Sequence, residues 1–224
     1  MQKLVQGVHK FQREIFGGQR DLFAGLADHQ SPHTLFITCA DSRINPNLLT
    51  QTAPGEIFIL RNAGNIVPSW GATLGGEAAT IEFAIAGLGV EHIVVCGHSN
   101  CGAMKAVLDP KITEKMPALR GWLTHAEATR RIVEENYSHT KGEDQLNVAT
   151  QENVLAQIEN LRTHPTVAAR LAKGKLRIHG WVYKISTGDV FAYDPEIGQF
   201  GSLADANVVI PRPRIFGSAD ALGT

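Results

Sequence analysis

Short runs of consecutive apolar residues recur along the first half of the chain and predict buried β-strands. The runs lie at 34–38, 57–60 and 92–96. They lack alternating polar positions, which is typical of strands in a sheet that is covered on both faces. The alanine-rich stretch 74–88 between the last two runs is helical in character. The order strand, helix, strand therefore indicates a parallel sheet.

Helical spacing of apolar residues dominates the rest of the chain. Over residues 4–16 it predicts an amphipathic helix, whose apolar face must pack on its own core or on another subunit. The segments 176–185 and 190–193 alternate as strands that a tight turn joins. Further helices are expected at 102–108, 118–137, 146–161 and 166–172.

These elements predict an α/β fold with a mostly parallel central sheet of four strands plus an edge strand, flanked by helices, with an N-terminal helical arm. The chain has 224 residues, a length that favours one domain with appendages. We expect a single domain over residues 1–200 that includes the helical arm at 1–30. Residues 201–224 lose the pattern and are expected to form a C-terminal tail.

Composition and charge narrow the class of protein. The formal net charge is −1, which argues against a nucleic-acid or membrane partner because both require a basic surface. No signal-peptide core or membrane-spanning stretch is apparent, so a cytoplasmic location is expected. The three cysteines exclude a disulfide framework. They favour reduced cysteines that either pack or take part in chemistry.

Polar residues follow each of the first three predicted strands. In open α/β sheets, ligands bind beyond the carboxyl ends of the strands. We therefore expect these three polar segments to meet in one crevice. The segments are Cys39-Ala-Asp-Ser-Arg43, Arg61-Asn-Ala-Gly-Asn65 and His98-Ser-Asn-Cys101.

Cys39, His98 and Cys101 are candidate zinc ligands. Catalytic zinc sites combine three thiolate or imidazole ligands with an open fourth position. Spacing alone leaves two alternatives, a buried inert Cys39 with a solvated His98, and a closed structural zinc site. Asp41 and Arg43 can form a carboxylate–guanidinium pair beside the metal and orient a metal-activated water. A plain structural ion pair is the alternative for these two residues.

Taken in order, the motifs Cys-x-Asp-Ser-Arg, Arg-Asn-x-x-Asn and Gly-His-Ser-x-Cys-Gly resemble those of the β-class carbonic anhydrases. The resemblance covers about residues 1–195 and is greatest to the bacterial and cyanobacterial branch. It implies a zinc lyase (carbonate dehydratase) that converts carbon dioxide reversibly to bicarbonate and a proton. In this reaction a zinc-bound hydroxide attacks CO₂, and an Asp41–Arg43 dyad orients the hydroxide. The implied role is inorganic-carbon supply and bicarbonate balance.

The resemblance also assigns individual residues. Cys39, His98 and Cys101 would hold one Zn²⁺ per subunit, with Asp41 as a fourth ligand in an inactive state. The implied partners are CO₂ and bicarbonate, together with further copies of the chain in a homodimer, homotetramer or larger even oligomer that exchanges N-terminal arms. The branch resemblance raises the carboxysome as an alternative location. The implied substrate-binding positions are Gln30, Phe58, Phe83 and the backbone N–H of Gly102.

One position departs from the family pattern. Some family members bind bicarbonate in a second, inhibitory pocket built from tryptophan, arginine and tyrosine. Arg61 and Tyr183 match two of these positions, but Phe36 stands where the tryptophan would be. We therefore expect inhibition by bicarbonate to be weakened or absent.

Two alternative functions stay open at this point. The first keeps the scaffold and changes the substrate to carbon disulfide or carbonyl sulfide, because hydrolases of these compounds resemble the same family. The second is a non-catalytic zinc-containing assembly or sensor protein. An oriented Asp41–Arg43 pair counts against the second alternative, since a structural zinc site does not need an oriented hydroxide.

Overall fold

The computed structural model describes residues 1–204, which fall into two compact units. The first unit is Met1–Ser31, and the second begins at Pro32. Of the tail expected at 201–224, residues 205–224 lie outside the described part. No helix in the described part is long and apolar enough to span a membrane.

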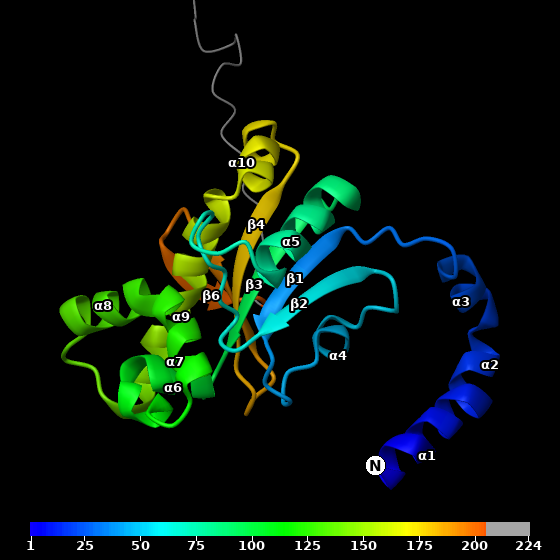
Figure 1. The fold of residues 1–224 in the computed structure, drawn as a ribbon, viewed down its shortest axis with the longest axis horizontal. Helices are drawn as coiled ribbons and strands as arrows, with labels where there is room; N and C mark the ends of the chain where they lie inside the picture. Colours follow the sequence, from blue (N-terminus) through cyan, green and yellow to red (C-terminus); the bar gives the residue numbers. More distant parts are fainter. Residues whose placement is uncertain (205–224) are drawn as a thin grey trace, which may run out of the picture. The chain divides into compact units, whose positions relative to one another are not determined.

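The first unit is the expected helical arm (Figure 1). Its elements are α1 (Gln2–Lys10), a π-helical turn η1 (Phe11–Ile15), α2 (Phe16–Gly18) and α3 (Arg20–Leu26). The rings of Phe11, Phe16 and Phe23 lie 5.3 to 6.2 Å apart, centre to centre. No residue of these four elements is buried, so the apolar face is only partly covered by its own unit.

The second unit contains a six-stranded sheet in the order β2-β1-β3-β4-β5-β6 (Figure 1). Its strands are β1 (Thr34–Cys39), β2 (Ile57–Asn62), β3 (His92–His98), β4 (Arg177–Tyr183), β5 (Val190–Asp194) and β6 (Gln199–Ser202). The first four are parallel, and β5 and β6 are antiparallel to their neighbours. The predicted fold class is confirmed, with one edge strand more than expected. β6 has only four residues, too few to show a pattern of alternation.

Helices of the second unit connect and cover the strands. They are α4 (Pro46–Thr50), α5 (Gly76–Glu82) with a π-helical turn η2 (Phe83–Gly87), α6 (Gly102–Leu108), a 3₁₀ turn η3 (Pro110–Thr113), α7 (Pro117–Leu123), a 3₁₀ turn η4 (Thr124–Ala126), α8 (Glu127–Asn136), α9 (Gly142–Arg162) and α10 (Pro165–Ala172).

The single helix expected over 118–137 is wrong, because η4 separates α7 from α8. The Thr124 hydroxyl donates to the Gly121 carbonyl, a local bond that competes with the helical ladder. Ala126 then leaves helical geometry, with φ −106° and ψ 16°. Leu123 and Ala126 are both buried in the same core cluster, so packing stabilises the break.

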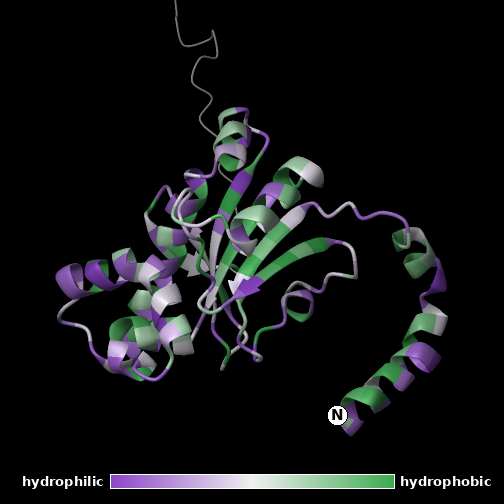
Figure 2. Cartoon of the chain, in the orientation of Figure 1, coloured by the Kyte–Doolittle hydropathy of each residue, from purple (hydrophilic) through white to green (hydrophobic). Residues whose placement is uncertain are grey.

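Alternate residues of the apolar strands face two different cores. Leu35 and Ile37 of β1 pack with residues of α5, α9 and α10, whereas Phe36 packs on the other side of the sheet. Figure 2 shows β1 and most of β2 as hydrophobic ribbons. Two glycines let α9 approach the sheet closely, because a Cβ on Gly97 or Gly180 would lie 2.9 Å from side-chain atoms of α9.

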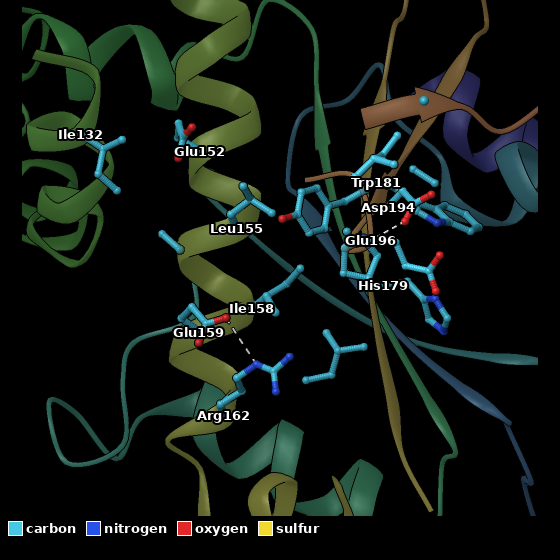
Figure 3. A pocket seen from close by; sticks show the side chains of 18 of the residues that line it. Ile132, Glu152, Leu155, Ile158, Glu159, Arg162, His179, Trp181, Asp194 and Glu196 are labelled. Carbon is cyan, nitrogen blue, oxygen red and sulfur yellow. Dashed lines mark hydrogen bonds and ion pairs between the residues drawn. The ribbon is translucent and has the colours of Figure 1, made fainter. Parts of the chain in front are cut away.

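A cleft of about 640 Å³ lies between α9 and the strands β4 to β6 (Figure 3). His179 on β4 lines this cleft, and its Nε2 lies 3.1 Å from Nδ1 of His92 on β3. Burial lowers the pKa of His179 to about 4 and also lowers the pKa of His92. The folded protein therefore keeps this pair neutral at a pH where unfolded histidine is already protonated.

We expect this histidine pair to destabilise the fold in mild acid. As the pH falls from 6.5 towards 4, the unfolded chain takes up protons that the folded chain does not, so the free energy of unfolding falls. The shift at His179 corresponds to at most about 3 kcal/mol. Denaturant melts of His179→Asn should show a shallower loss over this range, while the exposed-site control His139→Asn follows the wild type. Equal slopes for wild type and His179→Asn would contradict the prediction.

Candidate metal centre

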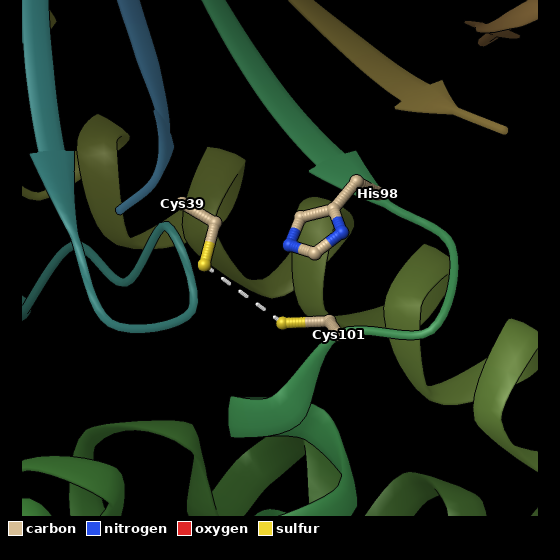
Figure 4. A group of neighbouring side chains, drawn as sticks. All are labelled: Cys39, His98 and Cys101. Carbon is tan, nitrogen blue, oxygen red and sulfur yellow. Dashed lines mark hydrogen bonds between the residues drawn. The ribbon is translucent and has the colours of Figure 1, made fainter. Parts of the chain in front are cut away.

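Cys39, His98 and Cys101 lie together at the carboxyl edge of the parallel strands (Figure 4). Cys39 ends β1, His98 ends β3, and Cys101 precedes α6. Their potential ligand atoms all lie within 4.8 Å of one another, and the two sulfur atoms are 4.0 Å apart. All three residues are buried. The structure thus brings together three side chains that are up to 62 residues apart in the sequence.

The His98 ring presents a free lone pair to this cluster. Its Nδ1 lies 3.0 Å from the Ser99 carbonyl oxygen, and a carbonyl can only accept. Nδ1 therefore carries the proton, and Nε2 is the unprotonated nitrogen. Nε2 is buried and has no hydrogen-bond partner among residues 1–204. A buried polar atom without a partner is unfavourable, and a metal ion at the cluster would satisfy it.

The two thiols cannot easily ionise together without a cation. A hydrogen bond from Cys101 is the largest cause that lowers the pKa of Cys39 to about 4, and the backbone N–H groups of Gly64 and Asp41 act in the same direction. The bond to Cys39 and burial raise the pKa of Cys101. A divalent metal ion takes both as thiolates. The donor set therefore fits a metal ion, and thiolate with imidazole is a combination that zinc prefers.

Asp41 and Arg43 form a two-point ion pair beside the cluster. Arg43 Nε donates to Asp41 Oδ1 at 2.9 Å, and Nη2 donates to Oδ2 at 2.7 Å. These bonds from Arg43 hold the pKa of Asp41 well below its usual range. Asp41 Oδ2 lies 3.8 Å from His98 Nε2. A hydrogen-bond acceptor that is ionised at neutral pH therefore lies at the edge of the cluster.

Arg61 on β2 forms hydrogen bonds to the backbone of the segment that contains Cys39, Asp41 and Arg43. Its guanidinium donates to the carbonyl oxygens of Cys39, Asp41 and Ile44 at 2.7 to 3.0 Å. The sequence places Arg61 in one of the segments expected at the crevice and matches it to a second bicarbonate pocket. The clamp could not be read from the sequence, because it depends on how the loop after β1 folds back onto β2.

Phe36, which stands where that second pocket would have tryptophan, is buried in the core. Its ring packs edge-on against Trp181, with ring centres 6.0 Å apart. A phenyl ring offers no N–H donor, and Arg61 already donates to backbone carbonyls. The weakened inhibition by bicarbonate stays a prediction, which these contacts favour.

Two of the expected substrate-binding positions differ in their placement. Gly102 directly follows Cys101 and is the first residue of α6, where N–H groups have no partner within the helix. Its N–H therefore has no partner within α6 and belongs to the residue that follows a member of the cluster. Gln30 is exposed and belongs to the first unit.

The expected aromatic positions pair with each other rather than with the cluster. The rings of Phe58 and Phe83 lie 6.0 Å apart, and Phe83 is 51% exposed. Phe58 lies on β2 four residues before Asn62, which pairs with Cys39. Four residues of a strand span about 13 Å, so Phe58 does not reach the cluster of its own chain.

Sequence reasoning missed the individual role of Gly64. Its N–H donates to Cys39 Sγ at 3.4 Å. Its φ is +85°, which is strained for other residues, and a Cβ there would lie 2.9 Å from Ala103 Cβ. Gly64 lies inside the motif at 61–65, so the sequence indicates its position but not its contact with Cys39. Trp122, whose indole N–H donates to the Ala63 carbonyl at 2.8 Å, had no signal in the sequence.

Comparison with known proteins identifies the family. A family model described as carbonic anhydrase matches residues 34–190. The solved structure of the β-carbonic anhydrase CcaA is 49% identical with a TM-score of 0.89, over 90% of this chain and 98% of that chain. The chain belongs to the β-carbonic anhydrase family. The expectation that it is a carbonic anhydrase is thereby confirmed.

Two further relatives of this β-carbonic anhydrase extend the comparison. A carbonic anhydrase from Synechocystis sp. is 50% identical over 201 residues, which cover 89% of this chain and 73% of the relative. One of two tetrameric β-carbonic anhydrases from the filamentous ascomycete Sordaria macrospora is 29% identical, with a TM-score of 0.78. That match covers 89% of this chain and 98% of the fungal one.

Proposed function

We propose that this β-carbonic anhydrase interconverts carbon dioxide and bicarbonate with a zinc ion held by Cys39, His98 and Cys101. One observation carries the proposal: the buried Nε2 of His98, which has no hydrogen-bond partner in the described part of the chain, lies with two thiols beside an Asp41–Arg43 ion pair. A closed structural site would not need a carboxylate fixed at its edge. We propose inorganic-carbon supply and bicarbonate balance as the physiological role.

The residues around the cluster suit each part of this reaction. Zinc bound there would activate a water for attack on CO₂ near neutral pH. The Asp41 carboxylate, fixed by Arg43, accepts a hydrogen bond from the attacking oxygen and so directs a lone pair at the CO₂ carbon. Ile66 and Met104 pack in the same buried cluster as the two cysteines and make the surroundings of the cluster apolar, which suits an uncharged substrate such as CO₂. We propose that the Gly102 N–H donates to bicarbonate.

We further propose that a second copy of the chain completes each substrate pocket. Phe58 and Phe83 lie away from the cluster of their own chain, and the helices of the arm have no buried residue. Gln30, Phe58 and Phe83 would therefore serve the centre of the partner subunit, with one zinc per subunit in a dimer or tetramer. The tetrameric fungal relatives support self-association.

The test is stopped-flow CO₂ hydration by protein whose zinc content has been measured. We expect zinc-dependent hydration between about pH 7 and 9, where a zinc-activated water is available. Fully zinc-loaded protein without hydration activity would reject the proposal. Hydrolysis of carbon disulfide and carbonyl sulfide, measured in parallel, would then separate the alternative substrate from a non-catalytic zinc protein.

A further inference from the structure

Buried amide side chains interrupt the apolar face of α9. Asn153 is 1% exposed and Gln157 is 0% exposed, although their neighbours Val154 and Ile158 belong to the main core. An amide that leaves water without a hydrogen bond is strongly unfavourable. The partners of these two amides therefore show what the polar positions stabilise.

Their partners are backbone groups of the loop after β2. Asn153 Nδ2 donates to the Gly64 carbonyl at 3.0 Å, and Gln157 Oε1 accepts from the Val67 N–H at 2.8 Å. Asn160, one turn further on, donates to the Val67 carbonyl at 2.8 Å. α9 thus binds this loop at Gly64 and at Val67. Gly64 is also the residue whose N–H contacts the Cys39 sulfur.

Both peptide groups that flank the Gly64 Cα atom are anchored. The group before it contains the Ala63 carbonyl and the Gly64 N–H, and Trp122 of α7 binds this carbonyl. The group after it contains the Gly64 carbonyl, which Asn153 binds. Between these anchors Gly64 keeps a positive φ and directs its N–H at the Cys39 sulfur. Rotation of the group before Gly64 would move that N–H away from the sulfur. The anchor on the group after it restricts rotation about the two backbone bonds of the Gly64 Cα atom.

We propose that Asn153 and Trp122 are positioning residues of the metal centre, which hold the Gly64 N–H on the Cys39 sulfur. The inference rests on the proposed metal at Cys39. Such a hydrogen bond withdraws electron density from a thiolate and fixes the direction of its lone pairs, so it tunes the metal through its ligand. Supporting contacts of this kind typically change metal affinity by about 10- to 100-fold.

The test uses cobalt(II) in place of zinc, because thiolate-to-cobalt charge transfer reports directly on the sulfur. The variants are Asn153→Leu, which removes the amide at similar volume, and Trp122→Phe, which keeps a ring and removes only the N–H donor. In both we expect the charge-transfer band to move to longer wavelength, because the sulfur becomes more electron-rich. We also expect cobalt affinity to fall by roughly 10-fold.

Asn160→Leu is the matched control, since it removes a bond from the same helix to the same loop but not to Gly64. It should keep the wild-type band, even where its melting temperature falls. If Asn153→Leu does not fold, the charge-transfer band and cobalt affinity of Trp122→Phe test the inference. Variants that lose stability but keep the wild-type band and affinity would overturn the inference and leave the proposed function intact. Wild-type protein that binds no cobalt would overturn both.

Discussion

Replacement of Cys101 by alanine is expected to release the metal and reduce CO₂ hydration to the uncatalysed rate. Cys101 Sγ lies 4.0 Å from Cys39 Sγ and within 4.8 Å of the His98 ring nitrogen, so its removal leaves only two ligands. Loss of a ligand exceeds the effect of losing a supporting contact, so we expect zinc affinity to fall by more than about 100-fold. Metal analysis after dialysis and stopped-flow hydration measure the two effects.

Cys96 supplies the matched control for this substitution. It is also a buried thiol, but burial raises its pKa to about 12, and it packs with Phe36, Ile44 and Val94 rather than at the cluster. Cys96→Ala should lower the melting temperature through a small cavity and retain zinc. Stoichiometric zinc in Cys101→Ala, or loss of zinc from Cys96→Ala, would contradict the ligand set.

The principal elements of the fold could be predicted because they depend on local patterns. Continuous apolar runs mark β1, β2 and β3, and the helical segment between β2 and β3 predicts that these two strands are parallel. Parallel strands end at the same edge of a sheet, so the residues that follow them are close neighbours in space. This rule predicts from the sequence that Cys39 and His98 lie close together.

The supporting contacts could not be predicted because they depend on long-range packing. Asn153 and Gly64 are 89 residues apart, and neither residue type indicates the other. The only hint is that Asn153 is a polar residue on the apolar face of a helix. Phe58 shows a second limit, since its relation to the site requires another copy of the chain. Phe58 lies about 13 Å along β2 from Asn62, the residue that pairs with Cys39.

The second large effect is expected from Asp41→Asn, which should lower kcat for CO₂ hydration by roughly 100-fold or more while zinc stays bound. Asparagine keeps the shape of the side chain but removes its charge. Its amide N–H₂ would then face the Arg43 guanidinium, in place of the oxygen that now accepts from Nη2 at 2.7 Å. The side chain could no longer hold a fixed acceptor beside His98. Stopped-flow hydration with parallel zinc analysis measures both parts of this prediction.

The lowered pKa of Asp41 determines the pH range in which its protonation can affect the protein. Arg43 holds the pKa of Asp41 below its usual range, so the folded chain binds fewer protons at this carboxyl than the unfolded chain. The stability that the ion pair contributes is present above about pH 4 and is lost only as the pH falls further. Any loss of activity near neutral pH must therefore arise from another group.

The control is Asp109→Asn, which replaces an exposed carboxylate that caps η3 and should keep wild-type activity. Wild-type kcat in zinc-loaded Asp41→Asn would show that the Asp41–Arg43 pair is only structural.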